Sequence, residues 1–421
     1  MEAQLKKRPD PYAPLRQRDF RLLLAGMLIT GLTSQMVTFA IAWELWLRTH
    51  SAFALGMVGL VQIVPIVLLS LPGGHVADQY DRKKVTAVTS LLLGACSLGL
   101  AWLSATQGSL LLIYTCLLGI GISRAFNDPA VSTLLPATVP PSLFATAATW
   151  SSSTYQVASI IGPAIAGLLA AVLDRLTLVY ALDAAAAVTF AVLIASIQGR
   201  PQAQARKAAT LDSLKEGLAF IRGEKVILAA ISLDMFAVLL GGAVTLLPIY
   251  ATDILKVGAQ GLGLMRAAPS IGALLIAVLQ AHLPPWRRAG RALLVAVAGF
   301  GLATIVFGLS TSFWLSIVML ALLGGLDNIS VVIRRTLILT RSPDEMRGRI
   351  AAVNSIFIGA SNELGGFESG LTAGLFGPVL SVVVGGIGTL LVVLGVARAW
   401  PEMRNLKSLA DPDSLAEEAS S

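Results

Sequence analysis

Long apolar stretches, separated by short breaks rich in glycine, proline and charge, run through most of this 421-residue sequence. Hydrophobic residues make up 55% of the chain and charged residues only 13%. A helix needs about 20 apolar residues to cross the hydrocarbon core of a bilayer, and the stretches reach this length repeatedly without the alternation of a lipid-facing strand. The sequence therefore predicts an all-α membrane protein with twelve transmembrane helices, at residues 20–47, 53–77, 85–106, 109–135, 145–173, 177–197, 226–252, 259–283, 290–311, 313–340, 347–376 and 378–400.

The distribution of basic residues predicts the orientation of these helices. An even number of spans puts both termini on one side, and the tails and loops of that side carry 19 of the 31 Lys and Arg residues. The opposite side has only Arg48, Arg175 and Lys256. Because basic loops stay cytoplasmic, we expect both termini in the cytoplasm and the chain in a bacterial inner membrane. The polar, basic start and the long first apolar run are not typical of a cleavable signal peptide.

Charge and motif content exclude several functional classes. The net charge of +7 is spread over loops instead of forming a basic face with aromatic residues, so nucleic-acid binding is not expected. Cys96 and Cys116 fall inside predicted spans and His50, His75 and His282 are isolated, so neither a disulfide framework nor a metal site is expected. No phosphate-binding loop motif is present. Without convergent catalytic groups, an enzyme or a non-transporting receptor is the least favoured class, and no cofactor is expected.

The chain divides into two similar halves at its one long polar connection. We expect an N-terminal six-helix bundle at 1–197, a cytoplasmic linker at 198–225, and a C-terminal six-helix bundle with a cytoplasmic tail at 226–421. A constant offset of 203 residues relates glycines of the two halves: Gly121 to Gly324, Gly162 to Gly365, and Gly167 to Gly370. Such an internal repeat predicts two bundles with pseudo-two-fold symmetry.

The loop after the second predicted helix is unusually charged. It reads "LPGGHVADQYDRKKV" and includes Gly74, Asp78, Arg82 and Lys83. Asp78 falls at the end of the helix, where a carboxylate can accept bonds from a neighbouring helix N-terminus or pair with an arginine. A contact of this kind suits a latch that forms in one conformation and breaks in another. In the simpler interpretation the basic residues only enforce topology.

The fifth predicted helix contains the small-residue segment "ASIIGPAIAGLL", in which Gly162, Pro163 and Gly167 stand out. Small residues allow helices to approach closely, and proline removes one backbone bond and permits a kink. Ordinary tight packing would also account for this pattern.

Charged residues inside the spans are candidates for a substrate or proton site, because burying them is costly. Arg124, Asn127 and Asp128 share one face of the fourth helix, where Arg124 and Asp128 can pair. Asp327 occupies the repeat position of Arg124, so the two halves place opposite charges at equivalent depths.

The remaining candidates are Glu44, Asp234, Arg266 and Glu363. Glu44, like Asp183, lies where it could be solvated near an interface, and Asp234 could cap a contact between helices. A desolvated carboxylic acid can exchange a proton near neutral pH, which favours Asp327 and Glu363 as proton carriers. For each acid a structural ion pair is an equally good interpretation.

Residues 18–400 resemble the major facilitator superfamily. Its signature G-x-x-x-D-R/K-x-G-R/K-R/K matches the loop after helix 2 at the four positions named above and departs from it at Gln79 and Asp81. The segment in helix 5 resembles the antiporter signature of the same superfamily. "SLPGG", "DMFAVLLGGAVTLLPIYA" and "SPDEMRGRI" are similar to the branch that includes enterobactin exporters and macrolide-efflux proteins.

This resemblance implies a secondary active transporter that works by alternating access. The leading interpretation is a proton-coupled exporter of a small amphipathic molecule, such as a siderophore or a drug, with the proton gradient as its energy source. A lipid or lysolipid flippase, or an importer, on the same fold is the alternative. The expected partners are the substrate, protons and membrane lipids, and the superfamily implies a monomer.

Overall fold

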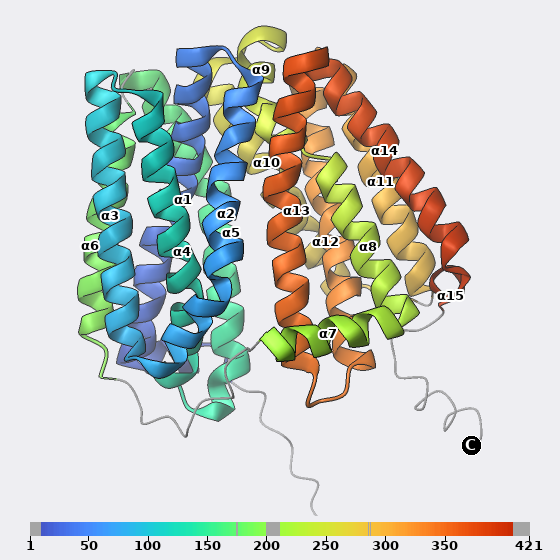
Figure 1. Ribbon diagram of the computed structural model, residues 1–421, viewed down its shortest axis with the longest axis horizontal. Coiled ribbons are helices and arrows are strands. Elements are labelled where there is room, and N and C mark those ends of the chain that lie inside the picture. The colour runs from blue at the N-terminus through green and yellow to red at the C-terminus, as the bar shows by residue number, and fades with distance from the viewer. Residues whose placement is uncertain (1–9, 174–175, 199–210, 285, 287, 407–421) are drawn as a thin grey trace, which may run out of the picture.

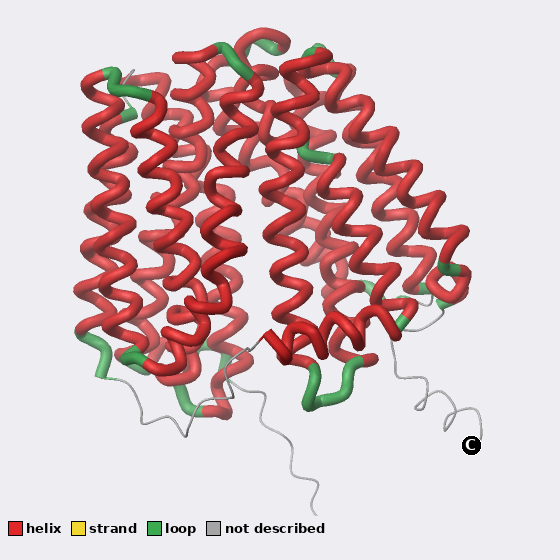
Figure 2. The backbone as a smooth tube through the Cα atoms, viewed as in Figure 1, coloured by secondary structure: helices red, strands yellow, loops and turns green. Residues whose placement is uncertain are grey.

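The computed structural model describes residues 10–173, 176–198, 211–284, 286 and 288–406, and within this part the chain is helical with no strand (Figures 1 and 2). The side chain of Asp78 lies outside the described part. The helices are α1 (Arg18–Thr49), α2 (Ala52–Gln79), α3 (Arg82–Thr106), α4 (Leu110–Thr138), α5 (Phe144–Leu173), α6 (Thr177–Ala195), α7 (Leu211–Gly223), α8 (Lys225–Leu240), α9 (Leu247–Ile249), α10 (Gly258–His282), α11 (Ala289–Leu309), α12 (Phe313–Arg341), α13 (Arg347–Phe376), α14 (Pro378–Ala399) and α15 (Pro401–Asn405).

Twelve of these segments correspond to the predicted spans. Within the described residues, eleven are long and apolar enough to cross a membrane, counting Lys225–Ile254 as one. The twelfth is α13, which has 30 residues and runs the height of the molecule in Figure 1. It is less apolar because it contains Arg347, Arg349, Glu363 and Glu368. The twelve-helix fold class is confirmed.

The seventh span is not the continuous helix predicted at 226–252. Helix α8 ends at Leu240, and a 3-10 turn, the short α9 and a π-helical turn at Tyr250–Ile254 follow. Gly241 and Gly242 lie at the break, and a Cβ added to Gly242 would lie 2.6 Å from the carbonyl oxygen of Gly365 on α13. The glycine allows the two backbones to approach closely.

The helices form two bundles, α1–α6 and α8–α14, joined along two seams. Helix α2 packs against α13, and α5 packs against α10. We call the end where α1 begins and α14 ends the terminal face, and the other end the distal face. Figure 1 shows the terminal face at the bottom, with α2 and α13 close together near the distal face and diverging below it.

Repeat-related glycines make equivalent contacts in the two bundles. A Cβ added to Gly162 of α5 would lie 2.8 Å from the carbonyl oxygen of Leu32 on α1, and one added to Gly365 of α13 would lie 2.8 Å from that of Val238 on α8. The predicted repeat is therefore visible in the packing, because α1 and α8 hold equivalent positions.

Glycines also form both seams. A Cβ on Gly167 of α5 would lie 2.6 Å from the carbonyl oxygen of Ala259 on α10. On the other seam, a Cβ on Gly370 of α13 would lie 2.7 Å from the backbone nitrogen of Gly56 on α2. Contacts this short leave no room for a side chain, so the seams are backbone-to-backbone contacts.

The distal face is closed across the bundles. One hydrophobic core there combines α1, α4 and α5 with α9, α10 and α12, whereas the other buried clusters each belong to a single bundle. Trp46 of α1 donates its Nε1 hydrogen to Thr252 Oγ1 of the second bundle at 2.8 Å. The rings of Phe53 and Phe367 lie 6.2 Å apart across the α2–α13 seam.

Helix α7 was not expected within the predicted linker, whose residues 199–210 lie outside the described part. It lies along the terminal face below α13 and α8 (Figure 1). Ile221 is 1% exposed and packs in a cluster with Ile350 and Val353 of α13, and Glu216 forms an ion pair with Arg349. The helix is amphipathic, with its apolar side against the second bundle and charges outward.

Candidate transport site

Arg124 forms the polar centre of the first bundle. Its guanidinium donates to Ser34 Oγ of α1 at 2.9 Å and to Gln62 Oε1 of α2 at 3.3 Å. Asp128 lies one turn along α4 without forming the possible ion pair, although Arg124 acts on it electrostatically. Asn127 accepts a hydrogen bond from Thr89 Oγ1 at 2.9 Å. The three predicted residues of α4 line a common cavity of about 420 Å³ between α1, α3, α4, α5 and α6.

Asp183 of α6 lines the same cavity and was underestimated by sequence reasoning. The residue is 4% exposed, not solvated, and its Oδ2 accepts a 2.6 Å hydrogen bond from Ser97 of α3. The sequence signal was an acid in an otherwise apolar helix, but its depth depends on how α6 packs.

The second bundle contains a buried group of two acids and one arginine. Asp234 of α8 forms an ion pair with Arg334 of α12, whose side chain is 2% exposed. The Ser330 hydroxyl donates a hydrogen bond of 3.4 Å to Asp234 Oδ1. Ser330, Asp234 and Asp327 together line a small cavity. Both Asp234 and Arg334 act on Asp327 electrostatically. We call Asp234, Asp327 and Arg334 the acid–arginine cluster.

Arg334 was missed because it lies near the terminal end of an apolar helix, where a basic residue usually serves topology. Its pairing with Asp234 crosses from α12 to α8, between residues 100 positions apart in the sequence. Asp327 thus occupies the repeat position of Arg124 but lies in the core of its own bundle, against α8 and α11.

Two further candidates lie near the seams between the bundles. Glu363 of α13 lies against Gly59 of α2, and a Cβ added to Gly59 would lie 3.1 Å from Glu363 Oε2. Arg124 of the first bundle acts electrostatically on the Glu363 carboxylate. Arg266 of α10 has a buried Nε without a hydrogen-bond partner in the described part of the chain.

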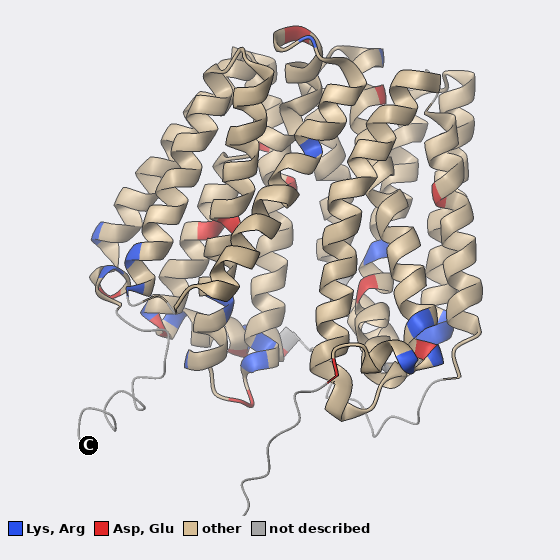
Figure 3. Cartoon of the chain, turned by 180° about the vertical axis from the view of Figure 1, so that it is seen from behind, with Lys and Arg blue, Asp and Glu red and all other residues tan. Residues whose placement is uncertain are grey.

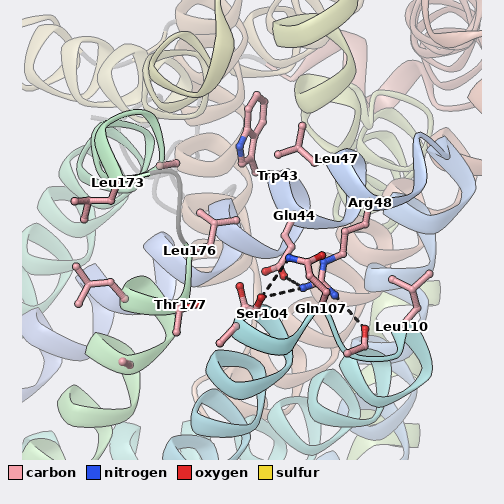
Figure 4. A pocket seen from close by; sticks show the side chains of 15 residues that line it. Trp43, Glu44, Leu47, Arg48, Ser104, Gln107, Leu110, Leu173, Leu176 and Thr177 are labelled. Carbon is pink, nitrogen blue, oxygen red and sulfur yellow. Dashed lines mark hydrogen bonds and ion pairs between the residues drawn. The ribbon is translucent and has the colours of Figure 1, made fainter.

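Glu44 lies apart from these groups, in a pocket of about 1100 Å³ that involves α1, α3, α4, α5 and α6 at the distal face. Its carboxylate forms an ion pair with Arg48 and accepts a 2.8 Å hydrogen bond from the Tyr180 hydroxyl. Figure 4 shows Arg48 turned toward Glu44, and its guanidinium also donates to the Gly108 carbonyl at 3.1 Å. The residue is 7% exposed, so the expectation of a solvated acid was wrong.

The charged loop after α2 connects elements of the first bundle at the terminal face. Asp81 caps the N-terminus of α3 by accepting the Lys83 backbone N–H at 2.9 Å, and Lys83 Nζ donates to the Ile197 carbonyl beyond α6 at 3.0 Å. Gly74 has open space where a side chain would be. Asp81, which departs from the superfamily signature, thus has a capping role.

Figure 3 shows most of the basic and acidic residues near the terminal face, with a few inside the bundles. In the described residues no group of three or more His, Cys, Asp and Glu side chains could hold a metal ion.

Twelve helices in two symmetric bundles, with partly paired charges buried inside each, define a membrane transporter of the major facilitator superfamily. The chain belongs to the transmembrane secretion effector family, whose model matches residues 9–417. It is 26% identical over 392 residues to the enterobactin exporter EntS of Escherichia coli strain K12, an alignment that covers 92% of this chain and 93% of the relative. The relatives are transporters of this superfamily and not enzymes.

Solved structures show the same fold. A bacterial homologue of the human lysosomal transporter Spinster, in an inward-facing and unoccupied conformation, has a TM-score of 0.74 at 13% identity and covers 93% of this chain and 98% of its own. The nucleoside transporter NupG has a TM-score of 0.71 at 10% identity and covers 91% of this chain and 99% of its own.

Proposed function

We propose that the chain exports a small amphipathic molecule of the siderophore class from the cytoplasm, in exchange for protons, by alternating access. The terminal face would be cytoplasmic, as the basic loops suggest. Export of a siderophore is supported by the relatives, which are enterobactin exporters with similar length and 26% identity. One chain holds both bundles, so we propose a functional monomer.

The observation that carries this proposal is the one-sided closure of the molecule. Seams of glycine and a shared hydrophobic core join the bundles near the distal face, and the remaining buried clusters belong to single bundles. Rocking the bundles about these seams would open one face as the other closes. If the terminal face is cytoplasmic, as proposed, this closure would correspond to the state that accepts substrate for export.

Proton coupling is supported by the charge of the acid–arginine cluster. Two carboxylates and one guanidinium carry one net negative charge when all are ionised, and an uncompensated charge is expensive in a desolvated site. Binding one proton makes the cluster neutral. Asp327 is the proposed carrier because Arg334 is ion-paired with Asp234. Glu363 is the second carrier proposed, because it lies at the seam that must open.

The test uses inverted membrane vesicles, in which the cytoplasmic face is outside, with an acidic lumen. Added enterobactin should accumulate in the lumen, and a lumenal pH dye should report alkalinisation as protons leave. Asp327→Asn should abolish acceleration by the pH gradient while exchange without a gradient persists. The control is Asp212→Asn on α7, whose side chain is 84% exposed and should leave both activities unchanged.

Each of three outcomes would contradict a different part of the proposal: the coupling, the direction or the substrate. Accumulation that survives complete dissipation of the pH gradient and the membrane potential would disprove coupling. Movement of enterobactin only out of these vesicles would reverse the direction and indicate an importer. Transfer of lysolipid between leaflets without enterobactin flux would favour the flippase.

A further inference from the structure

Arg266 faces the interior of the molecule from α10. Each residue of a helix turns by about 100°, so the side chain of Arg266 points away from those of Leu264 and Leu275. These two leucines are 48% and 64% exposed and mark the outer side of α10. It lies within about 60° of Gly263 and Ser270. Gly263 contacts α5, and the Ser270 carbonyl accepts a 2.6 Å hydrogen bond from α5. Arg266 therefore lies on the interior side of α10, close to the α5 seam.

This guanidinium has no counterion in the described part of the chain. Its Nε is buried without a hydrogen-bond partner among the described residues. Arg334 also has a buried Nε without a hydrogen-bond partner, but it is ion-paired with Asp234, and Arg124 is hydrogen-bonded to Ser34 and Gln62. Leaving a cation in this condition is costly inside a membrane, so the cost needs a functional reason.

The repeat relates Arg266 to a residue next to a hydrogen-bond partner of Arg124. The 203-residue offset relates Arg266 to Ile63 of α2, and α2 and α10 hold equivalent positions in their bundles. The neighbour of Ile63 is Gln62, which accepts a hydrogen bond from Arg124. Each bundle thus has an interior arginine near a seam, and acids accompany the one on α4, because the charge of Arg124 acts on Asp128 and Glu363.

We propose that Arg266 binds the acidic group of the transported molecule and so restricts the substrates to anionic amphiphiles. The planar guanidinium suits a carboxylate, a catecholate or a sulfonate, which can accept two parallel hydrogen bonds. The substrate would supply the counterion that the protein lacks. This inference rests on the proposed transport function but names a substrate class that the fold alone does not specify.

Binding can be tested without any gradient. The purified full-length protein in nanodiscs of neutral lipid is titrated with dansylglycine, which carries a carboxylate, and with uncharged dansylglycinamide. Energy transfer from the 7 tryptophans reports the bound dye. Wild type should prefer the acid by about tenfold or more, as expected for a hydrogen-bonded charge contact. Arg266→Gln should remove this preference, and Arg266→Lys should keep part of it.

Thermal unfolding separates a binding residue from a structural one. Arg266→Gln removes an uncompensated charge, so the Tm of the ligand-free protein should stay equal or rise. Arg334→Gln is the matched control, because it strands Asp234 and should lower the Tm.

A fall in Tm for Arg266→Gln comparable to that for Arg334→Gln would make Arg266 structural and overturn the proposal. Absence of a preference for the acid in wild type, or its persistence in Arg266→Gln, would also overturn it. Failure of proton-driven export would leave these binding and stability results unchanged, so the two proposals can fail independently.

Discussion

The ion pair between Arg334 and Asp234 lies wholly inside the second bundle, with side chains 2% and 7% exposed. Breaking such a pair by removing one partner leaves the other charge buried and uncompensated. The two possible removals are not equivalent here, because Asp327 belongs to the same cluster and feels both charges. The structure therefore predicts an order of stability among substitutions of these three residues.

Arg334→Gln should be the most damaging change, since it leaves Asp234 and Asp327 together without a cation. Its expected cost is about 3–5 kcal/mol of unfolding free energy. Asp234→Asn leaves Arg334 with Asp327 as a remaining counterion, so about 1–3 kcal/mol is expected. Asp327→Asn removes a like charge from the neighbourhood of Asp234 and should change stability by less than about 1 kcal/mol.

Thermal unfolding of the detergent-solubilised protein at one fixed scan rate would measure this order, because irreversible transitions depend on scan rate. The double variant Asp234→Asn/Arg334→Gln should recover part of the loss seen with Arg334→Gln alone, as expected for coupled neighbours. If Arg334→Gln and Asp234→Asn proved equally destabilising, Asp327 would not share the arginine, and the reasoning behind the cluster would be wrong.

Three other regions give predictions of their own. Gly167→Leu should force the α5–α10 seam apart, because no space exists beside its Cα; transport should slow and labelling from the distal face should rise, whereas Gly395→Leu, with open space, should have neither effect. Ile221→Ala should loosen α7 at a cost of about 2–5 kcal/mol and increase proteolysis there, while Glu216→Gln, in an exposed pair, should cost less than about 1 kcal/mol. Asp78→Asn should slow turnover while substrate affinity stays within a few fold, and loss of affinity at normal turnover would refute the latch.

The fold could be predicted from the sequence because its signals are local or repeated. Each span is a continuous apolar run, and the relation of Gly162 to Gly365 survives as equal contacts in the two bundles. The break in the seventh span was harder to predict, because Gly241 and Gly242 mark a helix end only when α13 packs against them. Helix α7 was missed because its apolar side is discontinuous in sequence and its polar residues are typical of a linker.

The candidate site could be predicted only in part, because pairing depends on which helices face each other. Asp234, Asp327 and Arg124 stand out as charges in apolar helices, but nothing local indicates that Arg334 reaches Asp234 across two helices. At Glu44 the position near a helix end suggested a solvated acid, but Arg48 and the rest of its bundle enclose the side chain.

The two bundles use one backbone plan for two different electrostatic arrangements. Glycines at repeat positions lie where helices approach closely, within the bundles at Gly162 and Gly365 and across the seams at Gly167 and Gly370, and any side chain there would be excluded. Polar positions are free of that constraint, so Arg124 in one half corresponds to Asp327 in the other. A symmetric scaffold can rock between two faces, but protons and an anionic substrate need sites of opposite charge. Under the two proposals, divergence of the polar residues between the halves would provide these sites, with the acidic carrier in the second bundle's core and the arginine beside its seam.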